Sequence, residues 1–200
     1  MQVLGYFYTR MKLPAAIRYL LHRFRAKNRH GLHSPYIYNL LDKIVYDHAP
    51  RPAYTEIAAL ARALPPAAIT TQAPRPNSQK VNRLLYRLLQ YFAPETLAVA
   101  DNVNAITALY LRQAAPDARV VDWQAADVMV CDAANPPLLP GIFKPGAVLI
   151  ITHIHADGAA LAFWRQVKQQ PELNVTVDFF WLGLAFCRPG QVREGFRLRF

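Results

Sequence analysis

Two short apolar stretches decide the fold: Asp127-Val-Met-Val-Cys131 and, after a loop rich in proline and glycine, Ala147-Val-Leu-Ile-Ile151. Both have the length of a strand and are rich in β-branched residues, so each predicts a strand that is buried on both faces. Helical spacing of apolar residues precedes them over 104–113 and follows them over 159–169. Apolar strands that alternate with helices are typical of an α/β fold with a mostly parallel sheet.

Other segments complete the sheet and precede it. Further strands are expected over 96–100 and 118–123, as an antiparallel pair over 174–180 and 181–187, and as an edge strand over 196–200. Helices are expected to begin near Pro14, at Ser34-Pro35, near Ala53, and at Asn77 or Ser78. We therefore expect a helical N-terminal region over residues 1–76 and an α/β domain over residues 77–200.

The composition fits a globular protein of a reducing compartment. Of the 200 residues, 53% are apolar, which excludes a disordered chain. The two cysteines, Cys131 and Cys187, lie in apolar runs and exclude a disulfide framework. No stretch approaches the roughly 20 apolar residues of a membrane-spanning helix, and basic residues interrupt the N-terminus where a secretory signal needs an apolar core. We expect a cytoplasmic location.

Positive charge is concentrated in the first half of the chain. The formal net charge is +10, and residues 1–100 hold 14 Lys and Arg against 4 Asp and Glu, whereas residues 101–200 hold nine of each kind. Such an asymmetry suggests an anionic partner for the N-terminal half. The residues expected to contact this partner are Arg18, Arg23, Arg25, Lys27 and Arg29.

The N-terminal helix combines this basic charge with an apolar stripe. The stripe consists of Leu13, Ile17, Leu20, Leu21 and Phe24. Arg18, His22 and Arg25 lie off it. One interpretation is a helix whose stripe packs on the core and whose basic face is solvated. The alternatives are a helix that binds an anionic membrane surface or a nucleic-acid backbone.

Several phrases of the sequence resemble one known family. They are His30-Gly-Leu-His-Ser-Pro35, the helix over 83–92, the pair Ile154-His155, and the tail over 181–200. Together they resemble class I S-adenosylmethionine-dependent methyltransferases, and more narrowly a bacterial group of methyltransferases and O-methyltransferases that opens with a basic helix and a His-Ser-Pro motif. The resemblance implies a Rossmann-like sheet with a C-terminal antiparallel strand pair, S-adenosylmethionine as cofactor, and a small-molecule methyl acceptor.

The turn that holds the cofactor in this family is altered here. In the family, the first strand ends in an acidic residue and a glycine-rich turn, where the backbone approaches the cofactor closely. Residues 97–109 contain no glycine, and Val99 stands at the acidic position. The resemblance assigns the methionine part of the cofactor to Asp101, Asn102 and Asn104, and the ribose to Asp122. The cofactor site is therefore predicted to be degenerate.

The domain is also shorter than its relatives. The predicted strand over 118–123 is followed almost at once by the strand over 127–131, where the family has about one further helix and strand. That additional unit contacts the adenine in the family. Its absence predicts a sheet shortened by about one helix–strand unit and a pocket that lacks one wall.

The resemblance places the acceptor near Asp132 and one of two histidines, His153 or His155. A histidine suits the base that removes the acceptor proton. Asp132, His153, His155 and Asp157 also form a His/carboxylate set of the kind that binds transition metals. A polar loop without an ion is the favoured interpretation of this set, and no metal is expected.

Two functions of different classes remain open from the sequence. The first is a methyltransferase, narrowed by the resemblance to an O-methyltransferase, with a degenerate cofactor site. The second is a catalytically inactive homologue that acts as a binding or scaffold module through its basic N-terminal face. The second follows from the joint loss of the glycines, the acidic residue and the adenine wall.

Overall fold

The computed structural model describes residues 14–27, 34–65, 75–139 and 141–200. Its elements, in chain order, are α2 (Ala15–Arg25), α3 (Pro35–Leu40), the π-helix η2 (Leu41–Val45), α4 (Pro52–Arg62), α5 (Gln79–Phe92), β1 (Thr96–Val99), α6 (Ala105–Ala114), β2 (Arg119–Val120), the 3-10 helix η4 (Trp123–Ala125), β3 (Val128–Asp132), β4 (Val148–Thr152), α7 (Gly158–Gln169), β5 (Leu173–Asp178), β6 (Leu182–Cys187) and β7 (Glu194–Arg197).

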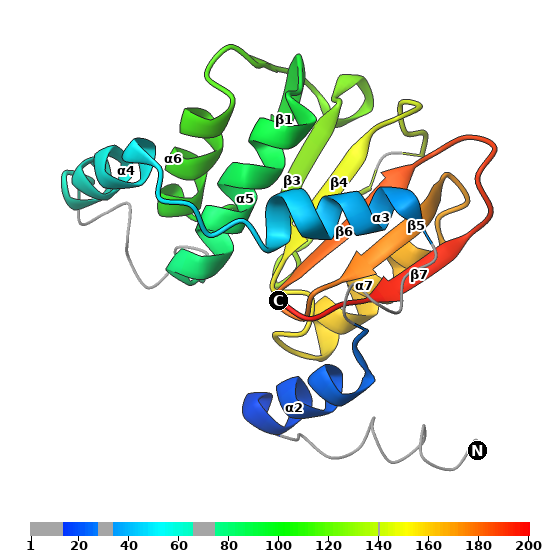
Figure 1. Cartoon of the computed structure of the whole chain (residues 1–200). Coiled ribbons are helices and arrows are strands. Elements are labelled where there is room, and N and C mark those ends of the chain that lie inside the picture. Colours follow the sequence, from blue (N-terminus) through cyan, green and yellow to red (C-terminus); the bar gives the residue numbers. More distant parts are fainter. Residues whose placement is uncertain (1–13, 28–33, 66–74, 140) are drawn as a thin grey trace.

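The strands form one seven-stranded sheet in the order β2-β1-β3-β4-β6-β5-β7 (Figure 1). Strands β2, β1, β3 and β4 run parallel to one another. Strand β6 is antiparallel to both β4 and β5, and β7 is parallel to β5 at the edge. The predicted α/β class is confirmed: the sheet is mostly parallel, and β5 and β6 near its C-terminal end are antiparallel.

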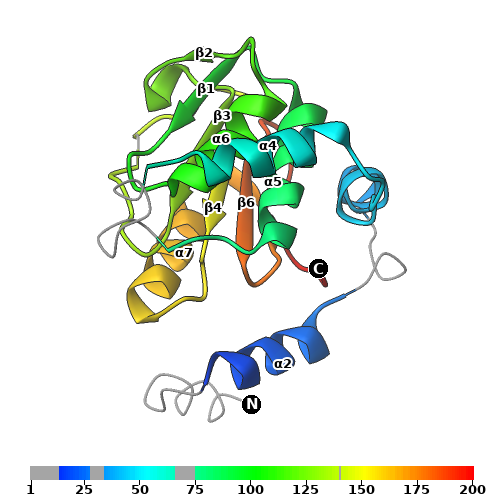
Figure 2. The same ribbon diagram turned by 90° about the vertical axis from the view of Figure 1, so that its left-hand side faces the viewer.

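Helices cover both faces of the sheet (Figure 2). Alternation along β3 turns Val128 and Val130 toward one face and Met129 and Cys131 toward the other. The first face packs against α3, η2, α5 and α6, and the second packs against α7. Helix α4 lies outside the first layer, in a separate cluster that it shares with α5 and α6. The core therefore includes α3 and η2 from before residue 77.

The predicted strand over 118–123 is much shorter in the structure. Strand β2 has two residues, both exposed, and it pairs only with Thr96 and Leu97 of β1. Because β2 is an edge strand with nothing packed outside it, the chain leaves the sheet there and forms η4 before β3. As the sequence predicted, no α-helix and no further strand separate β2 from β3.

Helix α2 is oriented opposite to the first interpretation of its sequence. Its buried residue is His22, which is 6% exposed. Ile17, Leu20 and Phe24 of the apolar stripe are 42%, 51% and 82% exposed. Leu21 is half-buried, and Leu13 lies outside the described residues. For Ile17, Leu20 and Phe24, the expectation that the stripe packs on the core is therefore wrong.

Hydrogen-bond donors explain the orientation of α2. Arg18 donates to the carbonyl oxygens of His155 and Ala156, at 2.8 and 3.2 Å, and the Tyr19 hydroxyl donates to the carbonyl of Phe200 at 3.3 Å. The surface beneath α2 thus presents backbone carbonyls, and buried carbonyls require donors that apolar side chains cannot supply. The polar face docks, and the apolar face remains outside.

No helix in the described part of the chain has the length and apolar character needed to cross a membrane.

Candidate functional site

The polar side chains of interest gather where the parallel strands end. In open α/β sheets, ligands bind in the crevice outside the carboxyl ends of the strands. At this edge the structure brings together the turn after β1, the end of β3, the loop after β4 and the end of β5. Helix α2 docks on the loop after β4 and on the C-terminal residues.

Asp132 and His153 form the first pair at this edge. Asp132 is 2% exposed, and its Oδ2 lies 2.6 Å from Nδ1 of His153 and 3.0 Å from the hydroxyl of Thr152. Because a carboxylate only accepts, Nδ1 of His153 carries the donated proton, which leaves the Nε2 lone pair of the neutral ring free. This is the arrangement of a histidine base that is oriented by a carboxylate.

The backbone at His153 is strained. Its φ is +57°, a left-handed conformation that few residues other than glycine adopt. A backbone hydrogen bond of 2.8 Å from His153 to Trp181 and the bond to Asp132 hold the residue in place. Strained backbone of this kind is often found at functional sites.

The predicted cofactor residues have mainly internal contacts. The side-chain amide of Asn102 donates to the carbonyls of Asp132 (2.8 Å) and Asn135, while its oxygen accepts from the Asp132 amide at 3.1 Å. Asn104 is 4% exposed and caps α6 by accepting from Ile106. Asp101 is exposed on the turn after β1, and Asp122 is exposed beyond β2. These residues do not fit S-adenosylmethionine as the family binds it, because no glycine opens the turn and the Asn102 amide is already used.

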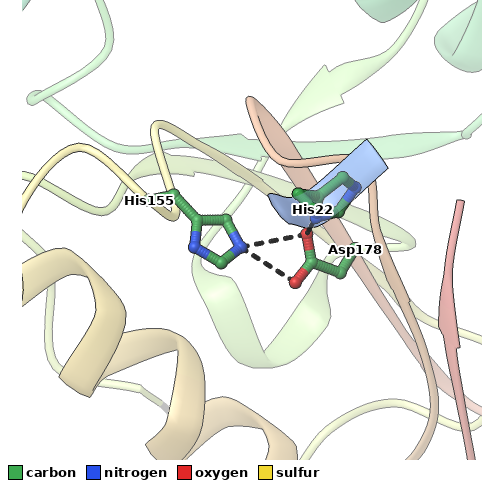
Figure 3. Close-up of side chains that lie close together, drawn as sticks. All are labelled: His22, His155 and Asp178. Carbon is green, nitrogen blue, oxygen red and sulfur yellow. Dashed lines mark hydrogen bonds and ion pairs between the residues drawn. The ribbon is translucent and has the colours of Figure 1, made fainter. Parts of the chain in front are cut away.

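A second cluster joins His22, His155 and Asp178 (Figure 3). Nε2 of His155 lies 2.9 and 3.1 Å from the two carboxylate oxygens of Asp178. Nδ1 of His22 lies 3.5 Å from Oδ1 of the same carboxylate. The sequence placed His155 beside Asp132, whereas the structure pairs it with Asp178.

Aromatic and backbone contacts fix this cluster. The ring of His155 stacks on Phe180 at 4.9 Å with 6° between the planes, and the ring of His22 meets Phe180 edge-on at 5.4 Å. Nε2 of His22 donates to the carbonyl of Leu198 at 3.1 Å. The cluster thereby ties α2 to the sheet.

Burial sets the protonation of the cluster. It lowers the pKa of His22, an effect that the negative charge of Asp178 only partly offsets. Burial alone would raise the pKa of Asp178, but hydrogen bonding to His155 and to the backbone of Phe180 helps to hold it below its usual value. The favoured state is therefore an ionised carboxylate beside a neutral His22.

The four residues of the predicted His/carboxylate set are divided between separate contacts. His153 pairs with Asp132, and His155 pairs with Asp178. The carboxylate of Asp157 caps α7 by accepting from Ala160 at 2.9 Å. The sequence analysis did not single out Asp178. Its position at the carboxyl end of β5 is the kind of place where ligand-binding residues lie, and this was an available signal. No pattern in the sequence pointed to His22, because its inward orientation depends on the docking of α2.

A basic cavity of about 380 Å³ lies between the segment over 48–55, α5 and the chain's last residue. Its cationic lining residues are Arg51, Lys80, Arg83 and Arg87, and its lining contains no carboxylate side chain. Burial lowers the pKa of Lys80, and the nearby charges of Arg23 and Arg87 lower it further.

The residues predicted to contact an anionic partner differ in their availability. The guanidinium of Arg18 is used in holding α2 on the loop after β4. Arg23, Arg25 and Lys27 are exposed. Arg29 lies outside the described residues.

Comparisons with known proteins find distant similarity. No protein-family model matches the chain, and no curated protein matches it. Among solved structures, the chain is similar to the crystal structure of a methyltransferase from Geobacter sulfurreducens, with 14% sequence identity and a TM-score of 0.45. The match covers 77% of this chain and 97% of that methyltransferase. Similarity at this level does not transfer an activity.

Proposed function

We propose that this protein is a binding module that attaches to anionic membrane surfaces through α2. The observation that carries the proposal is the outward apolar stripe of α2, in which Phe24 is 82% exposed. An apolar helix face bordered by basic residues is typical of helices that lie in the membrane interface. The proposal keeps the cytoplasmic location expected from the sequence, because the cytoplasmic leaflet of a membrane has a negative surface potential.

The basic residues border the stripe on both sides. With about 100° between successive residues of a helix, Arg23 and Arg25 lie on opposite flanks of the line through Leu20 and Phe24. Both are exposed, as is Lys27 just beyond the helix. Each cation near an anionic surface contributes about 1 kcal/mol to binding. The basic cavity lined by Lys80 would accept a headgroup phosphate in this proposal.

The apolar stripe distinguishes a membrane from a nucleic acid. A phosphate backbone attracts cationic side chains, so the exposed Ile17, Leu20 and Phe24 would contribute nothing to the free energy of binding a nucleic-acid backbone. In the acyl boundary each of these side chains gains up to about 1.5–3 kcal/mol on full burial. Part of each surface is already covered, so the true gain per residue is smaller.

Vesicle co-sedimentation tests the proposal. We expect the protein to pellet with phosphatidylcholine–phosphatidylglycerol vesicles and to stay in solution with phosphatidylcholine alone. Phe24→Ser should weaken binding to the anionic vesicles by about tenfold or more. Val192→Ser is the matched control, because Val192 is 79% exposed on a different part of the chain. Equal binding by Phe24→Ser and wild type would contradict the proposal.

Methyl transfer is a second candidate, supported by the Asp132–His153 pair and by the sequence resemblance. In that function Nε2 of His153 would accept the proton of the methyl acceptor, with Asp132 orienting the ring. We derive no step through S-adenosylmethionine, because the residues after β1 do not fit it. Calorimetric titration with S-adenosylmethionine decides the matter. Micromolar binding would establish the cofactor, and absence of heat at millimolar ligand with folded protein would eliminate this candidate.

A further inference from the structure

The cluster of His22, His155 and Asp178 contains one buried ring nitrogen that lacks a hydrogen-bond partner. Its three residues come from α2, the loop after β4 and the end of β5, and one ligand atom from each lies within 4.8 Å of the others. Figure 3 shows both rings directed at the carboxylate. Nδ1 of His22 is buried without a hydrogen-bond partner.

The hydrogen bond from His22 to Leu198 fixes which ring nitrogen of His22 carries the proton. Its Nε2 faces the carbonyl of Leu198, which can only accept, so Nε2 carries the proton. In the neutral ring, Nδ1 then presents a lone pair to Oδ1 of Asp178 across 3.5 Å. Two acceptors that face each other in a buried site are costly. A cation between them would remove this cost.

We propose that His22, His155 and Asp178 form a binding site for a divalent transition metal ion of the zinc class. Two imidazoles and one carboxylate are a common ligand set for such ions. Ligand atoms on a tetrahedral zinc ion are about 3.3 Å apart, since each bond is about 2.0–2.1 Å. Oδ1 of Asp178 lies 3.1 Å from Nε2 of His155 and 3.5 Å from Nδ1 of His22, on either side of this value. The two ring nitrogens lie within 4.8 Å of each other.

Surrounding groups already orient two of the three ligands. Metal-bound histidines usually donate their second ring N–H to a carbonyl or carboxylate, as His22 does to Leu198. Oδ1 of Asp178 accepts from the amide of Phe180 at 2.9 Å. His155 would exchange its bond to Asp178 for a bond to the metal.

A metal ion at this position would clamp α2 to the carboxyl edge of the sheet. It would bridge the helix to the loop after β4 and to β5, and three protein ligands leave one tetrahedral position for water or an external ligand. The site does not depend on membrane binding. It departs from the sequence-based expectation of no metal, which rested on a different set of residues.

Metal titration of the full-length, chelator-treated protein tests the site. We expect one Zn²⁺ per chain by calorimetry, and Co²⁺ should give the visible absorption of a tetrahedral ion. His22→Gln should weaken Zn²⁺ binding by at least about tenfold, by comparison with losses at outer-shell residues. His48→Gln is the control, because His48 is exposed and lies outside the cluster, and it should bind Zn²⁺ as the wild type does.

A second readout keeps the test decisive if His22→Gln fails to fold. In the wild type, Zn²⁺ should shift the imidazole NMR signals of His22 and His155 and leave those of His48 and His153 in place. The proposal is overturned if the wild type binds no Zn²⁺, if folded His22→Gln binds it equally well, or if the shifted signals belong to other histidines.

Discussion

At the scale of single residues, side chains expected to contact a cofactor connect parts of the protein to one another. Asn102 is the clearest case, because its amide bridges the turn after β1 to the backbone of Asp132 at the end of β3. In the family that this sequence resembles, glycines occupy this turn and leave space for a ligand. Here the side chain of Asn102 occupies the turn and links it to the end of β3.

Asn102→Ala should therefore destabilise the fold. It removes the partners of the amide and carbonyl of Asp132, and an unsatisfied buried polar group costs about 1–3 kcal/mol. We expect a decrease of that size in the free energy of unfolding, measured with urea. Asp101→Ala, at the exposed neighbouring position, should change stability by less than about 0.5 kcal/mol. Equal effects of the two substitutions would contradict the assigned role of Asn102.

His22 should make stability depend on pH. Burial lowers its pKa in the folded protein, so as the pH falls below about 6.5 the unfolded chain binds a proton that the folded chain resists. The free energy of unfolding of metal-free protein should thus decrease between about pH 7.5 and about pH 5.5. Asp178, His155 and Arg197 are the charged and titratable groups that act on this ring.

The comparison of two variants isolates this contribution. His22→Gln should lose less stability than the wild type over the same pH range, because glutamine does not titrate. His48→Gln should behave as the wild type, since His48 is exposed. An unchanged pH dependence in His22→Gln would show that the ring of His22 is not the responsible group.

At the scale of elements, the starts of two helices differ in a way that the sequence does not show. Ser34 and Ser78 both occupy N-cap positions, but only Ser78 accepts a hydrogen bond from the helix, at 3.3 Å from the amide of Val81. Ser78→Ala should lower the free energy of unfolding by about 1 kcal/mol. Ser34→Ala should have a much smaller effect, and similar losses at both positions would contradict this distinction. Urea unfolding measures both.

Strand β6 packs tightly against α7 at Gly183. A Cβ atom there would lie 2.9 Å from the ring of Trp164, which is fully buried. Gly183→Ala should destabilise the protein by about 1–3 kcal/mol through overpacking. Gly195→Ala on β7 is the control, because its nearest neighbour would be at 3.4 Å. Thermal unfolding would compare them, and equal stability of both variants would show that α7 can shift.

The elements also show what a sequence can predict here. Strands β3 and β4 were predictable because their apolar runs require burial on both faces, which few other structures provide. The length of β2 was not, because an edge strand has no such requirement. The orientation of α2 was not predictable either: its partners are backbone carbonyls contributed by loops more than a hundred residues away. The contact between His22 and Asp178 was not predictable for the same reason, because the two residues are far apart in the sequence.

Of the candidate site, the structure brings Asp132 and His153 together, because Asp132 ends β3 and His153 directly follows the neighbouring parallel strand β4. The sequence did not place His155 beside Asp178. Strand β6 separates β5 from β4 in the sheet, and His155 reaches Asp178, the last residue of β5, from the loop after β4. The pattern of residues within strands does not predict a contact between a loop and a strand that is not adjacent in the sheet.

At the scale of the whole molecule, the excess positive charge and the exposed apolar stripe coincide on α2 and its surroundings. The first half of the chain carries the entire net charge of +10. Arg23 and Arg25 are exposed on the same helix as the exposed Ile17, Leu20 and Phe24. Under the proposed function, this helix would be the part of the molecule that faces an anionic bilayer.

Salt should separate the two contributions to binding. Screening weakens the attraction of exposed charges, since the Debye length falls from about 10 Å at 0.1 M to about 3 Å at 1 M salt. Burial of the stripe is not screened. Binding to anionic vesicles should therefore weaken with salt but persist in part, and Arg23→Gln combined with Arg25→Gln should reduce the salt dependence. Complete loss at high salt would assign binding to charge alone.

The most direct measurement places an environment-sensitive fluorophore on the stripe itself. The label would be attached through Leu20→Cys, on the exposed side of α2, since the native Cys131 and Cys187 are buried. We predict a blue shift of its emission with phosphatidylcholine–phosphatidylglycerol vesicles, and none for a label attached through Val192→Cys. Identical emission from the Leu20 label with and without anionic vesicles would contradict the account.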